Sequence, residues 1–445
     1  MTTPISDFVK SYVEGEVLRL HMPGHKGEAL LGVEALDITE IEGADVLYSP
    51  TGIIAESEKN AAELFESGKT VYSTEGSSLS IRAMLYLALL WGRENGKDST
   101  VLAGRNAHRV FHSAAALLDL DVEWLYGDGD TLTSCKITPE ALDEALKRIE
   151  RKPFAVYLTS PDYLGNILDM VGLAEVARRH GILCLVDNAH GAYLNFLEES
   201  KHPISLGAHI CADSAHKTLP ALTGAGYLHI SRDAPSIIFE EADGAMALFA
   251  STSPSYLTLQ SLDEVNKYLS EGYAKALQSF CEEISSLKAE LRAHGYSFIG
   301  DEPLKLTIDA KAYGYSGEEI AELLRKSGIV CEHADRDALV LMLTPETGKE
   351  GLDRLCEALL SIGKKEALCQ RPPKQPRLCS AISAREAIMS RREKISAKDS
   401  LGRVLADATV SCPPAIPIAA LGEIIDENAI ELFEYYGIDT VTVVK

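Results

Sequence analysis

The feature that most constrains this chain is a short apolar run that ends in an acid. Ile182-Leu183-Cys184-Leu185-Val186 is followed directly by Asp187 and then by Asn188-Ala189-His190-Gly191. A continuous apolar run of this length, bounded by polar and glycine residues, predicts a strand that is buried on both faces of a parallel sheet. Open α/β sheets bind their ligands at the carboxyl ends of such strands, so we expect Asp187 to face a ligand.

A lysine motif follows thirty positions after this acid (217 − 187). It reads Ser214-Ala215-His216-Lys217-Thr218, and Thr223-Gly224-Ala225-Gly226 comes next. A carboxylate that keeps a pyridine nitrogen protonated, together with an amine that can form a Schiff base, is what pyridoxal 5'-phosphate requires of a protein. If Asp187 and Lys217 converge on one crevice, they predict this cofactor. The alternative is a buried salt bridge in an ordinary doubly wound domain.

Small hydroxyl residues begin a strongly helical segment earlier in the chain. Ser73-Thr74-Glu75-Gly76-Ser77-Ser78 precedes the helical run 79–91. Hydroxyl side chains at such a position commonly cap a helix by accepting its first N–H groups. The same N–H groups and the helix dipole also bind phosphate. Taken alone, the segment favours a cap, but together with Asp187 and Lys217 it favours a phosphate site.

Strand-like and helix-like segments alternate through much of the chain. Strands are predicted at 100–103, 154–159, 182–186, 209–212 and 227–230, and helices at 56–67, 79–91, 107–118 and 173–180. This alternation predicts a mostly parallel sheet that is covered by helices on both faces.

The last third of the chain has a different character. A long helical stretch is predicted at 257–294, and residues 296–365 then mix strands and helices in a compact α+β pattern. A polar, proline-bearing linker at 370–376 precedes a predicted amphipathic helix at 381–394.

The composition argues against several classes of protein. The chain has 445 residues, of which 46% are hydrophobic and 24% charged, which is typical of a globular protein with roughly two or three domains. Its formal net charge of −23 argues against a nucleic acid or an anionic membrane as partner. Its longest apolar stretch, 83–91, is too short to span a bilayer, and the first residues lack a signal-peptide layout. The nine cysteines, with no Cys-x-x-Cys pair, favour reduced thiols in the cytoplasm and no metal site.

Six motifs in order resemble those of the prokaryotic-type ornithine/lysine/arginine decarboxylases. The matching segments are Pro23-Gly24-His25-Lys26, Asp187-x-Ala189-His190-Gly191-Ala192, His216-Lys217-Thr218, Thr252-Ser253-Pro254-Ser255-Tyr256, Pro413-Pro414-x-Ile416-Pro417 and Gly422-Glu423. The resemblance runs nearly end to end and is to the short form of the family, without the N-terminal wing of longer members.

The resemblance implies an α/β fold of the aspartate-aminotransferase type, also called fold type I. Its large domain would hold a mostly parallel seven-stranded sheet, accompanied by a small α+β domain and a C-terminal α+β segment. The expected division is an N-terminal segment at 1–50, a cofactor-binding large domain at 51–255, a connecting helix with the small domain at 256–365, a linker at 366–377 and a C-terminal decarboxylase domain at 378–445.

The resemblance also implies roles for individual residues. Lys217 would form the Schiff base, Asp187 would pair with the pyridine nitrogen, and His108 would stack on the ring. The expected cofactor contacts are Gly76, Ser77, Ser78, His108, Asp187, Ala189, His190, Ser214, His216, Lys217 and Thr252. Family members form their active site at a dimer interface, so a homodimer is expected, with Thr252 or Ser253 acting on the partner's cofactor. Glu423 and Tyr163 are the expected substrate contacts.

The reaction implied is α-decarboxylation of lysine, arginine or ornithine to the corresponding amine through a quinonoid intermediate. A transaminase would usually keep an arginine on a strand of the small domain to clamp the substrate carboxylate. The predicted strand 338–344 has no arginine, although Arg336 lies just before it. The absence of a clamping arginine on the strand favours decarboxylation. Transamination, other Cα chemistry and a cofactor-binding protein without turnover remain the alternatives.

The chain departs from the family pattern at a few positions. Asn188 stands where an acid is usual, Glu75 replaces a small or amide residue, and Asp162 replaces a threonine. Val46 and Tyr48 replace an aspartate and a histidine. The cofactor set is intact, so these departures bear on the substrate and the activity rather than on cofactor binding.

Overall fold

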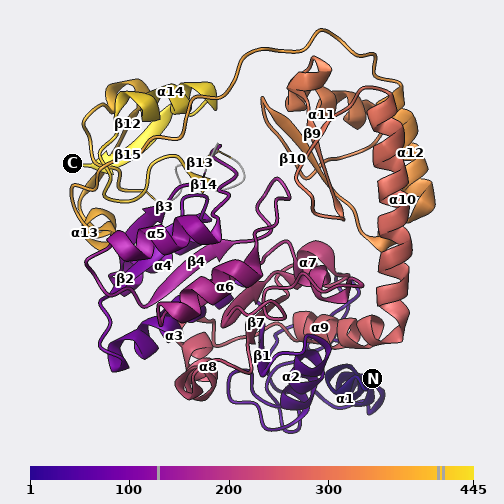
Figure 1. Ribbon diagram of the computed structural model, residues 1–445. Coiled ribbons are helices and arrows are strands. Elements are labelled where there is room, and N and C mark those ends of the chain that lie inside the picture. Colours follow the sequence, from indigo (N-terminus) through magenta and orange to yellow (C-terminus); the bar gives the residue numbers. More distant parts are fainter. Residues whose placement is uncertain (128–130, 408–410, 413–415) are drawn as a thin grey trace. The chain divides into compact units, whose positions relative to one another are not determined.

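The computed structural model describes residues 1–127, 131–407, 411–412 and 416–445 (Figure 1). The chain divides into two compact units, each assembled from two segments that are distant in sequence. Unit 1 comprises Met1–Gly96 and Ala177–Ala276, and unit 2 comprises Lys97–Val176 and Leu277–Lys445.

A seven-stranded sheet has the strand order β1-β7-β6-β5-β4-β2-β3. The strands are β1 (Lys69–Ser73), β2 (Thr100–Gly104), β3 (Asp121–Leu125), β4 (Ala155–Thr159), β5 (Leu183–Asp187), β6 (Ile210–Asp213) and β7 (Gly226–Ile230). β2 runs parallel to β3 and β4, and β5 runs parallel to β6, whereas β7 is antiparallel to β1 and β6. The predicted α/β class with a mostly parallel seven-stranded sheet is confirmed.

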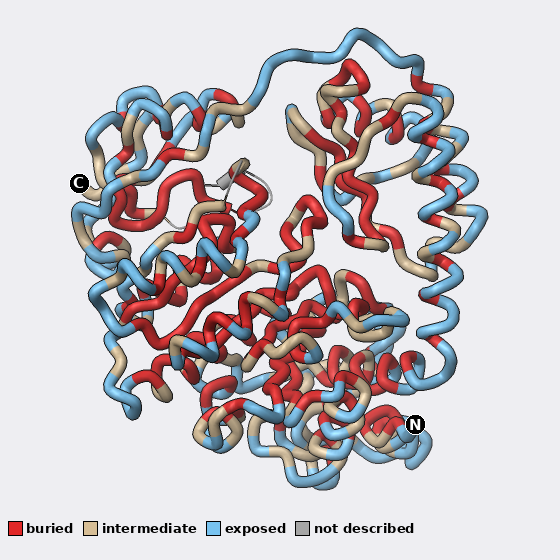
Figure 2. Tube along the Cα trace, viewed as in Figure 1, coloured by how far each residue is buried: buried red, intermediate tan, exposed pale blue. Residues whose placement is uncertain are grey.

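Burial explains why this sheet could be recognised from the sequence. Every residue of β2, β5 and β7 is buried. Figure 2 shows the inner part of the sheet region in the colour of buried residues. Strands that are covered on both faces need apolar side chains at every position, which produces continuous apolar runs. β3 was missed because its residues alternate between exposed and half-buried before Leu125.

The helices of unit 1 pack on its part of the sheet or on one another. They are α1 (Pro4–Glu14), α2 (Ile53–Leu64), α3 (Ser77–Glu94), α7 (Ala215–Thr218), α8 (Ser236–Phe249) and α9 (Tyr256–Tyr268). α3 packs against α8 and against β5, β6 and β7. α1 is fixed by a charge, because buried Asp263 of α9 accepts the N–H groups of Ile5 and Ser6 at 2.9 and 3.0 Å.

The long helix predicted at 257–294 is wrong in one respect. α9 ends at Tyr268, and α10 begins only at Ala274 and continues to Ala293. Between them, Gly272 has a φ of 93° and Glu271 a ψ of 48°, so the helical path is broken. A positive φ is easily adopted only by glycine, so Gly272 permits this break.

Unit 2 contains a small antiparallel sheet with the order β10-β11-β9-β8. Its strands are β8 (Phe298–Ile299), β9 (Lys305–Asp309), β10 (His333–Ala334) and β11 (Ala338–Met342). Helices assigned wholly or mostly to this unit are α4 (Arg109–Leu118), α5 (Pro139–Arg148), α6 (Met170–Arg179), α10, α11 (Gly317–Lys326) and α12 (Gly348–Leu360). A capping box between Ser316 and Glu319 fixes the start of α11.

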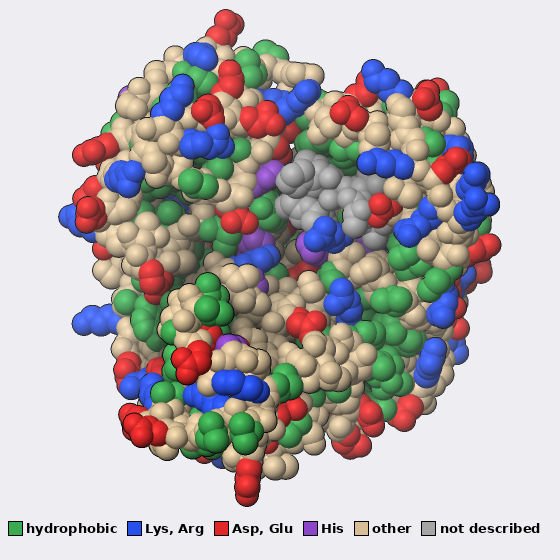
Figure 3. All heavy atoms as spheres, turned by 180° about the vertical axis from the view of Figure 1, so that it is seen from behind, with side chains coloured by type: hydrophobic (Ala, Val, Ile, Leu, Met, Phe, Trp, Pro, Cys, Tyr) green, Lys and Arg blue, Asp and Glu red, His purple; other side chains and the backbone are tan. Residues whose placement is uncertain are grey.

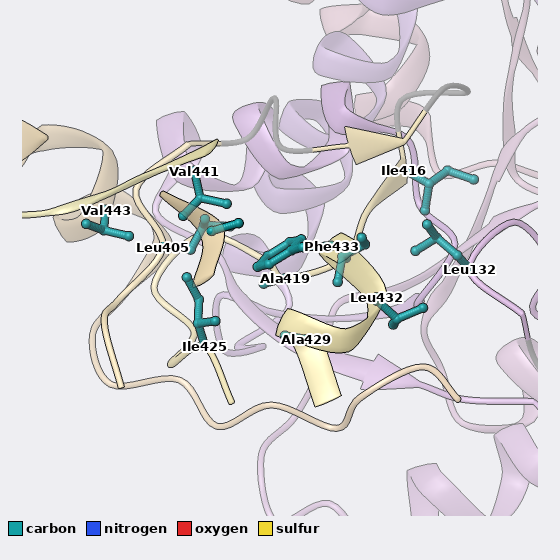
Figure 4. Close-up of a cluster of buried hydrophobic side chains, with 12 residues drawn as sticks. Leu132, Leu405, Ile416, Ala419, Ile425, Ala429, Leu432, Phe433, Val441 and Val443 are labelled. Atoms are coloured by element: carbon teal, nitrogen blue, oxygen red, sulfur yellow. The ribbon is translucent and has the colours of Figure 1, made fainter. Parts of the chain in front are cut away.

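The C-terminal part of unit 2 has its own small core. It contains α13 (Ala384–Met389), β12 (Arg392–Ser396), β13 (Ser411–Cys412), β14 (Ile416–Pro417), α14 (Glu427–Tyr435) and β15 (Thr440–Val444). Figure 4 shows side chains from α14, β15 and the neighbouring loops pointing toward one another around Phe433, which is fully buried. This cluster also includes Leu132, which comes from far earlier in the chain.

The predicted helix at 381–394 is wrong over most of its length. Only Ala384–Met389 is helical, and Arg392–Ser396 instead forms β12, which pairs with β15 in an antiparallel register. β15 is rich in β-branched residues and offers an edge for pairing, so a tertiary partner overrides the local helical pattern.

The surface carries charge of both signs. Figure 3 shows acidic and basic side chains scattered over the displayed face, with apolar side chains between them. In the part of the chain that the structure describes, no helix has the length and apolar character needed to cross a bilayer.

Candidate active site

Two neighbouring parallel strands of unit 1 end next to the predicted acid and the lysine motif. β5 ends at Asp187, which is paired in register with Ala212 of β6. β6 ends at Asp213, and α7 follows at once and carries Lys217. The Nζ atom of Lys217 lies 3.1 Å from Nε2 of His190, which comes three residues after Asp187. The loops after β5 and β6 therefore meet at one edge of the sheet.

Asp187 lies in an environment suited to a cationic partner. It is 3% exposed, and its Oδ1 accepts the N–H of Ala189 at 3.2 Å. A buried carboxylate is costly unless it is paired and hydrogen-bonded. A protonated ring nitrogen would provide such a partner.

The N-terminus of α3 forms a cradle of backbone groups. The helix begins at Ser77, and Gly76 before it has a φ of 68° and makes no side-chain cap. A Cβ on Gly226 would lie 2.9 Å from the carbonyl carbon of Gly76 and 3.1 Å from the nitrogen of Ser77. Glycine is therefore required at 226 for β7 to approach the cradle this closely. A helix start of this kind, with no side chain capping it, is suited to an anion.

Hydroxyl and imidazole side chains from the lysine segment border this cradle. Ser214 Oγ and Ser77 Oγ are hydrogen-bonded at 2.8 Å, and both residues are buried. His216 makes a 2.7 Å hydrogen bond from Nδ1 to the carbonyl oxygen of Ala225. That bond turns the ring toward Gly76, where Cε1 of His216 would be 3.6 Å from an added Cβ. The phosphate contacts expected of Ser77, Ser214 and His216 are thus gathered in one place.

These features fit pyridoxal 5'-phosphate. The cradle offers uncapped N–H groups and hydroxyls for a phosphate, Lys217 offers an amine for the aldehyde, and Asp187 offers a carboxylate for the ring nitrogen. Every one of these groups belongs to unit 1.

The expected partner-facing turn gathers several departures from the family pattern. Ser251, Thr252 and Ser253 are exposed, and the carboxylate of Glu75 accepts the Ser251 N–H at 2.7 Å. The side chain of Glu75 therefore binds the turn at 251–253. A cavity of about 190 Å³ is lined by Val46, Tyr48, Thr252 and their neighbours. The sequence gives no sign that Val46 and Tyr48 are adjacent to Thr252, because about two hundred positions separate them from it in the chain.

Two further predicted residues lie in unit 2. His108 is the N-cap of α4, and its Nδ1 accepts the N–H of Val110 at 3.3 Å. This contact is the capping role that a histidine at a helix start can have, and stacking on the cofactor stays a prediction. The hydroxyl of Tyr163 donates to Oε1 of Glu332 at 3.3 Å, and its ring makes an edge contact with His333 at 5.4 Å.

The departure at Asp162 has a local explanation. Its carboxylate is 3% exposed and accepts the N–H groups of Leu164 and Asn166 at 3.0 and 2.9 Å, and the side-chain amide of Asn166 at 2.8 Å. Burial raises the pKa of this carboxyl, against the effect of these donors. Asp162 thus fixes the turn that carries Tyr163.

Glu423 has partners within its own unit. It is 1% exposed, lies 3.3 Å from Nη2 of Arg105, and accepts the Ala420 N–H at 2.6 Å. Arg105 is fully buried, donates to the carbonyl oxygens of Pro417 and Ile418 at 3.0 and 2.8 Å, and stacks on Trp124. This environment supports a structural role for Glu423, and its contact with a substrate stays a prediction. Pro413 and Pro414 of the same C-terminal motif lie outside the described residues.

Arg105 was not predicted as a functional residue. The sequence offered one signal for it, a polar segment directly after the predicted strand 100–103, but its partner Glu423 is 318 positions away. No local pattern connects two residues at that separation.

Comparison with known proteins decides the family. Residues 3–300 match the family model described as "Orn/Lys/Arg decarboxylase, major domain". The chain belongs to the Orn/Lys/Arg decarboxylase family. The predicted resemblance is confirmed, and with it the assignment as a decarboxylase of basic amino acids.

Relatives in this family match the chain along almost its whole length. The arginine decarboxylase of Bacillus subtilis (strain 168) is 29% identical over 96% of this chain and 92% of its own. The arginine decarboxylase of Halalkalibacterium halodurans is 28% identical over 96% of this chain and 91% of its own.

Solved structures support the fold. The lysine decarboxylase of Francisella novicida superposes with a TM-score of 0.79 at 16% identity, covering 100% of this chain and 81% of that chain. Lysine decarboxylase A from Pseudomonas aeruginosa gives a TM-score of 0.80 at 16% identity, covering 99% of this chain and 80% of that chain. The predicted fold type I is thereby confirmed.

Proposed function

We propose that this protein uses pyridoxal 5'-phosphate to remove the α-carboxyl group of arginine, lysine or ornithine, with Lys217 as the residue that carries the cofactor. The observation that carries the proposal is the convergence, in unit 1, of the Lys217–His190 contact with the end of β5 at Asp187. The glycine-bordered start of α3 supports the phosphate end of the same cofactor.

Each protein group has a defined task in this proposal. Lys217 supplies the amine, and His190 Nε2, at 3.1 Å from Nζ, is within reach to exchange a proton with it. Asp187 keeps a ring nitrogen charged in a site that largely excludes water, where its electrostatic effect is larger than in solution. When bound, the cofactor supplies an electron sink for the charge left on Cα when carbon dioxide departs.

The binding residues hold the other end of the cofactor. Ser77, Ser214 and His216 would fix the phosphate, and the backbone of Gly76 and Ser78 would add N–H donors at the helix start. Fixing the phosphate orients the ring relative to Lys217, so that the bond to be broken has a defined direction. His108 would stack on the ring, and Ala189 would line its edge.

Decarboxylation is favoured over transamination by the small sheet. No residue of β11 (Ala338–Met342) is an arginine, so this strand offers no clamp for a substrate carboxylate. Arg336, just before it, lies over the ring of Tyr435 at 5.5 Å and is therefore engaged elsewhere. A carboxylate that is not clamped by a cation loses less stabilisation when it departs as carbon dioxide.

We also propose a homodimer in the cytoplasm. The exposed turn at Thr252, bordered by the cavity with Val46 and Tyr48, would then contribute to the partner's site. Exposed apolar side chains near the N-terminus support a covered surface there, among them Leu18, Leu20, Leu30 and Leu31. Tyr163 and Glu423 are retained as candidate substrate contacts.

A substrate panel tests the reaction. Arginine, lysine and ornithine, each labelled in the carboxyl carbon, are incubated with the holoenzyme, and released carbon dioxide and the amine product are measured. Arginine is placed first because the curated relatives named above are arginine decarboxylases. We expect carbon dioxide and the matching amine in equal amounts from one of the three.

Two results would contradict the proposal. Formation of a keto acid without carbon dioxide would identify a transaminase. A protein that binds the cofactor but leaves all three amino acids unchanged would instead be a binding protein without turnover. The Lys217→Ala variant is the control, and it should release no carbon dioxide from any of them.

A further inference from the structure

A fully buried carboxylate lies at the end of β6 and has no role in the chemistry described above. Asp213 is 0% exposed, and its Oδ1 accepts the side-chain amide of Asn188 at 2.8 Å and the thiol of Cys211 at 3.2 Å. Its Oδ2 lies 3.0 Å from Nε2 of His202 and 3.5 Å from Nε2 of His229. All five residues are buried parts of unit 1.

These neighbours keep Asp213 ionised. Burial opposes its charge, but the imidazoles of His202 and His229 outweigh burial and hold the pKa of this carboxyl well below its usual range. The N–H of Ile204 donates to Nδ1 of His202 at 3.3 Å, so the ring proton lies on Nε2 and points at Asp213. The other groups facing Asp213 stay neutral, because burial, reinforced by its charge, raises the pKa of Cys211 and of Tyr227.

The partner of this carboxylate is one of the positions where the chain departs from the family pattern. The family usually has an acid after the cofactor aspartate, and this chain has Asn188. Asn188 is 0% exposed, and its amide nitrogen Nδ2 lies 2.8 Å from Oδ1 of Asp213. An acid at 188 would bring two carboxylates to that distance, and one of them would have to take up a proton or move away.

We propose that Asn188 and Asp213 are a carboxylate–amide pair that positions the cofactor-binding segments, with the carboxylate at the end of β6 and the amide directly after β5. Asn188 directly follows Asp187, and Asp213 lies four residues before Lys217. One hydrogen bond therefore joins the two segments that carry the proposed cofactor ligands. Asp213 acts as a positioning residue for Asp187 and Lys217, and this role rests on the proposed function.

The pair also sets where a buried negative charge lies. Asp213 contributes one at the end of the strand next to Asp187, in surroundings of low dielectric. A nearby negative charge favours the protonated form of a titrating group. Removing it should therefore move the titration of the bound cofactor to lower pH.

Four proteins test the pairing: the parent, Asn188→Asp, Asp213→Asn and the double exchange of both. The readouts are the melting temperature without cofactor and the dissociation constant for pyridoxal 5'-phosphate. Asn188→Asp should weaken cofactor binding by at least about tenfold and lower the melting temperature, because two carboxylates face each other. Asp213→Asn should act in the same direction, because an amide at 213 has one oxygen for two facing donors, the amide of Asn188 and Nε2 of His202, so its NH2 group must face one of them. The double exchange should return to within about threefold of the parent.

A pH titration separates positioning from mere stability. The visible absorbance of the bound cofactor is followed against pH in each protein that binds it. Asp213→Asn should move the midpoint to lower pH, and the double exchange should move it back. A residue that only stabilises the fold would leave that midpoint unchanged.

Asn266→Asp is the matched control. Asn266 is also a 0% exposed asparagine of unit 1, and its amide donates to Tyr72 Oη at 2.7 Å and to the Ser57 carbonyl oxygen at 3.0 Å. Burying an acid there should destabilise the protein as well. Adding Asp213→Asn to it should give no rescue, because the two sites share no hydrogen bond.

Three outcomes would overturn the proposal. The double exchange could bind the cofactor no better than the weaker single variant, or the titration midpoint could stay unchanged in Asp213→Asn. Purified parent protein could also hold one metal ion per chain, since donor atoms of His202, Cys211 and Asp213 lie within 4.8 Å of one another. None of these readouts needs turnover, so rescue in a protein that releases no carbon dioxide would refute the proposed function and support the pairing.

Discussion

At the scale of single residues, buried carboxyl groups in this protein differ in charge because their neighbours differ. Asp213 is surrounded by imidazole and amide donors, which hold its pKa low. Glu58 is equally buried, but burial dominates there and raises its pKa to about 8, while its Oε1 accepts the Tyr72 N–H at 2.9 Å. The first carboxyl is a fixed negative charge, and the second is mostly protonated at neutral pH.

Glu58 should make the stability of the protein fall as pH rises. The unfolded chain releases this proton near pH 4.3, whereas the folded chain keeps it until about pH 8. Between those values the free energy of unfolding should decrease, by at most about 5 kcal/mol, and above pH 8 this contribution should be constant. Glu58→Gln keeps an acceptor for Tyr72 and has no proton to lose. Denaturant unfolding of both proteins from pH 4 to 9 measures the difference, and parallel curves would contradict the assignment.

At the scale of elements, the cradle depends on how closely β7 approaches the start of α3. The backbone of Gly226 leaves no room for a side chain, since an added Cβ would lie 2.9 Å from the backbone of Gly76. β7 and the start of α3 are more than a hundred residues apart in the chain, and they touch through the backbones of Gly226 and Gly76. The helix itself was predictable from its apolar run, and the contact was not.

Gly226→Ala should weaken cofactor binding by at least about tenfold, because the added methyl group must push the start of α3 away from its place. The dissociation constant for pyridoxal 5'-phosphate is the measurement. Gly244→Ala is the control, because Gly244 lies inside α8 and the nearest atom to its added Cβ is 3.9 Å away. Equal affinity in Gly226→Ala and the parent would show that the cradle is not the phosphate site.

The buried ion pair between Arg105 and Glu423 joins the C-terminal part of unit 2 to the segment that follows β2. Removing Glu423 leaves the guanidinium of Arg105 buried without its carboxylate. Glu423→Ala should therefore lower the free energy of unfolding by roughly 3–5 kcal/mol. Glu434→Ala is the control, because Glu434 pairs with Lys398 at an exposed position and should change stability by less than about 1 kcal/mol. A change for Glu423→Ala as small as that of the control would contradict the structural role.

At the scale of the whole molecule, the fold could be predicted from the sequence because it depends on local patterns. A buried parallel strand must be apolar throughout, and open α/β sheets bind ligands at the carboxyl ends of such strands, so Asp187 and Lys217 could be predicted as site residues from their positions, and their roles stay predictions. The contacts that join distant segments could not be predicted from the sequence. Asn188 with Asp213 and Arg105 with Glu423 depend on which strands and loops become neighbours.

Two of the differences in secondary structure have the same origin. The strand at 392–396 depends on its partner β15, and the break in the helical stretch depends on the conformation of Gly272. Both are tertiary or backbone effects that periodicity does not report.

The most direct test of the account is to find the residue to which the cofactor is attached. The holoenzyme is reduced with borohydride, which fixes a Schiff base as a stable amine, and is then digested and mapped by mass spectrometry. We predict the phosphopyridoxyl group on Lys217 alone, and its loss in the Lys217→Ala variant. A label on another lysine, or no label in a protein that releases carbon dioxide from a basic amino acid, would contradict the account.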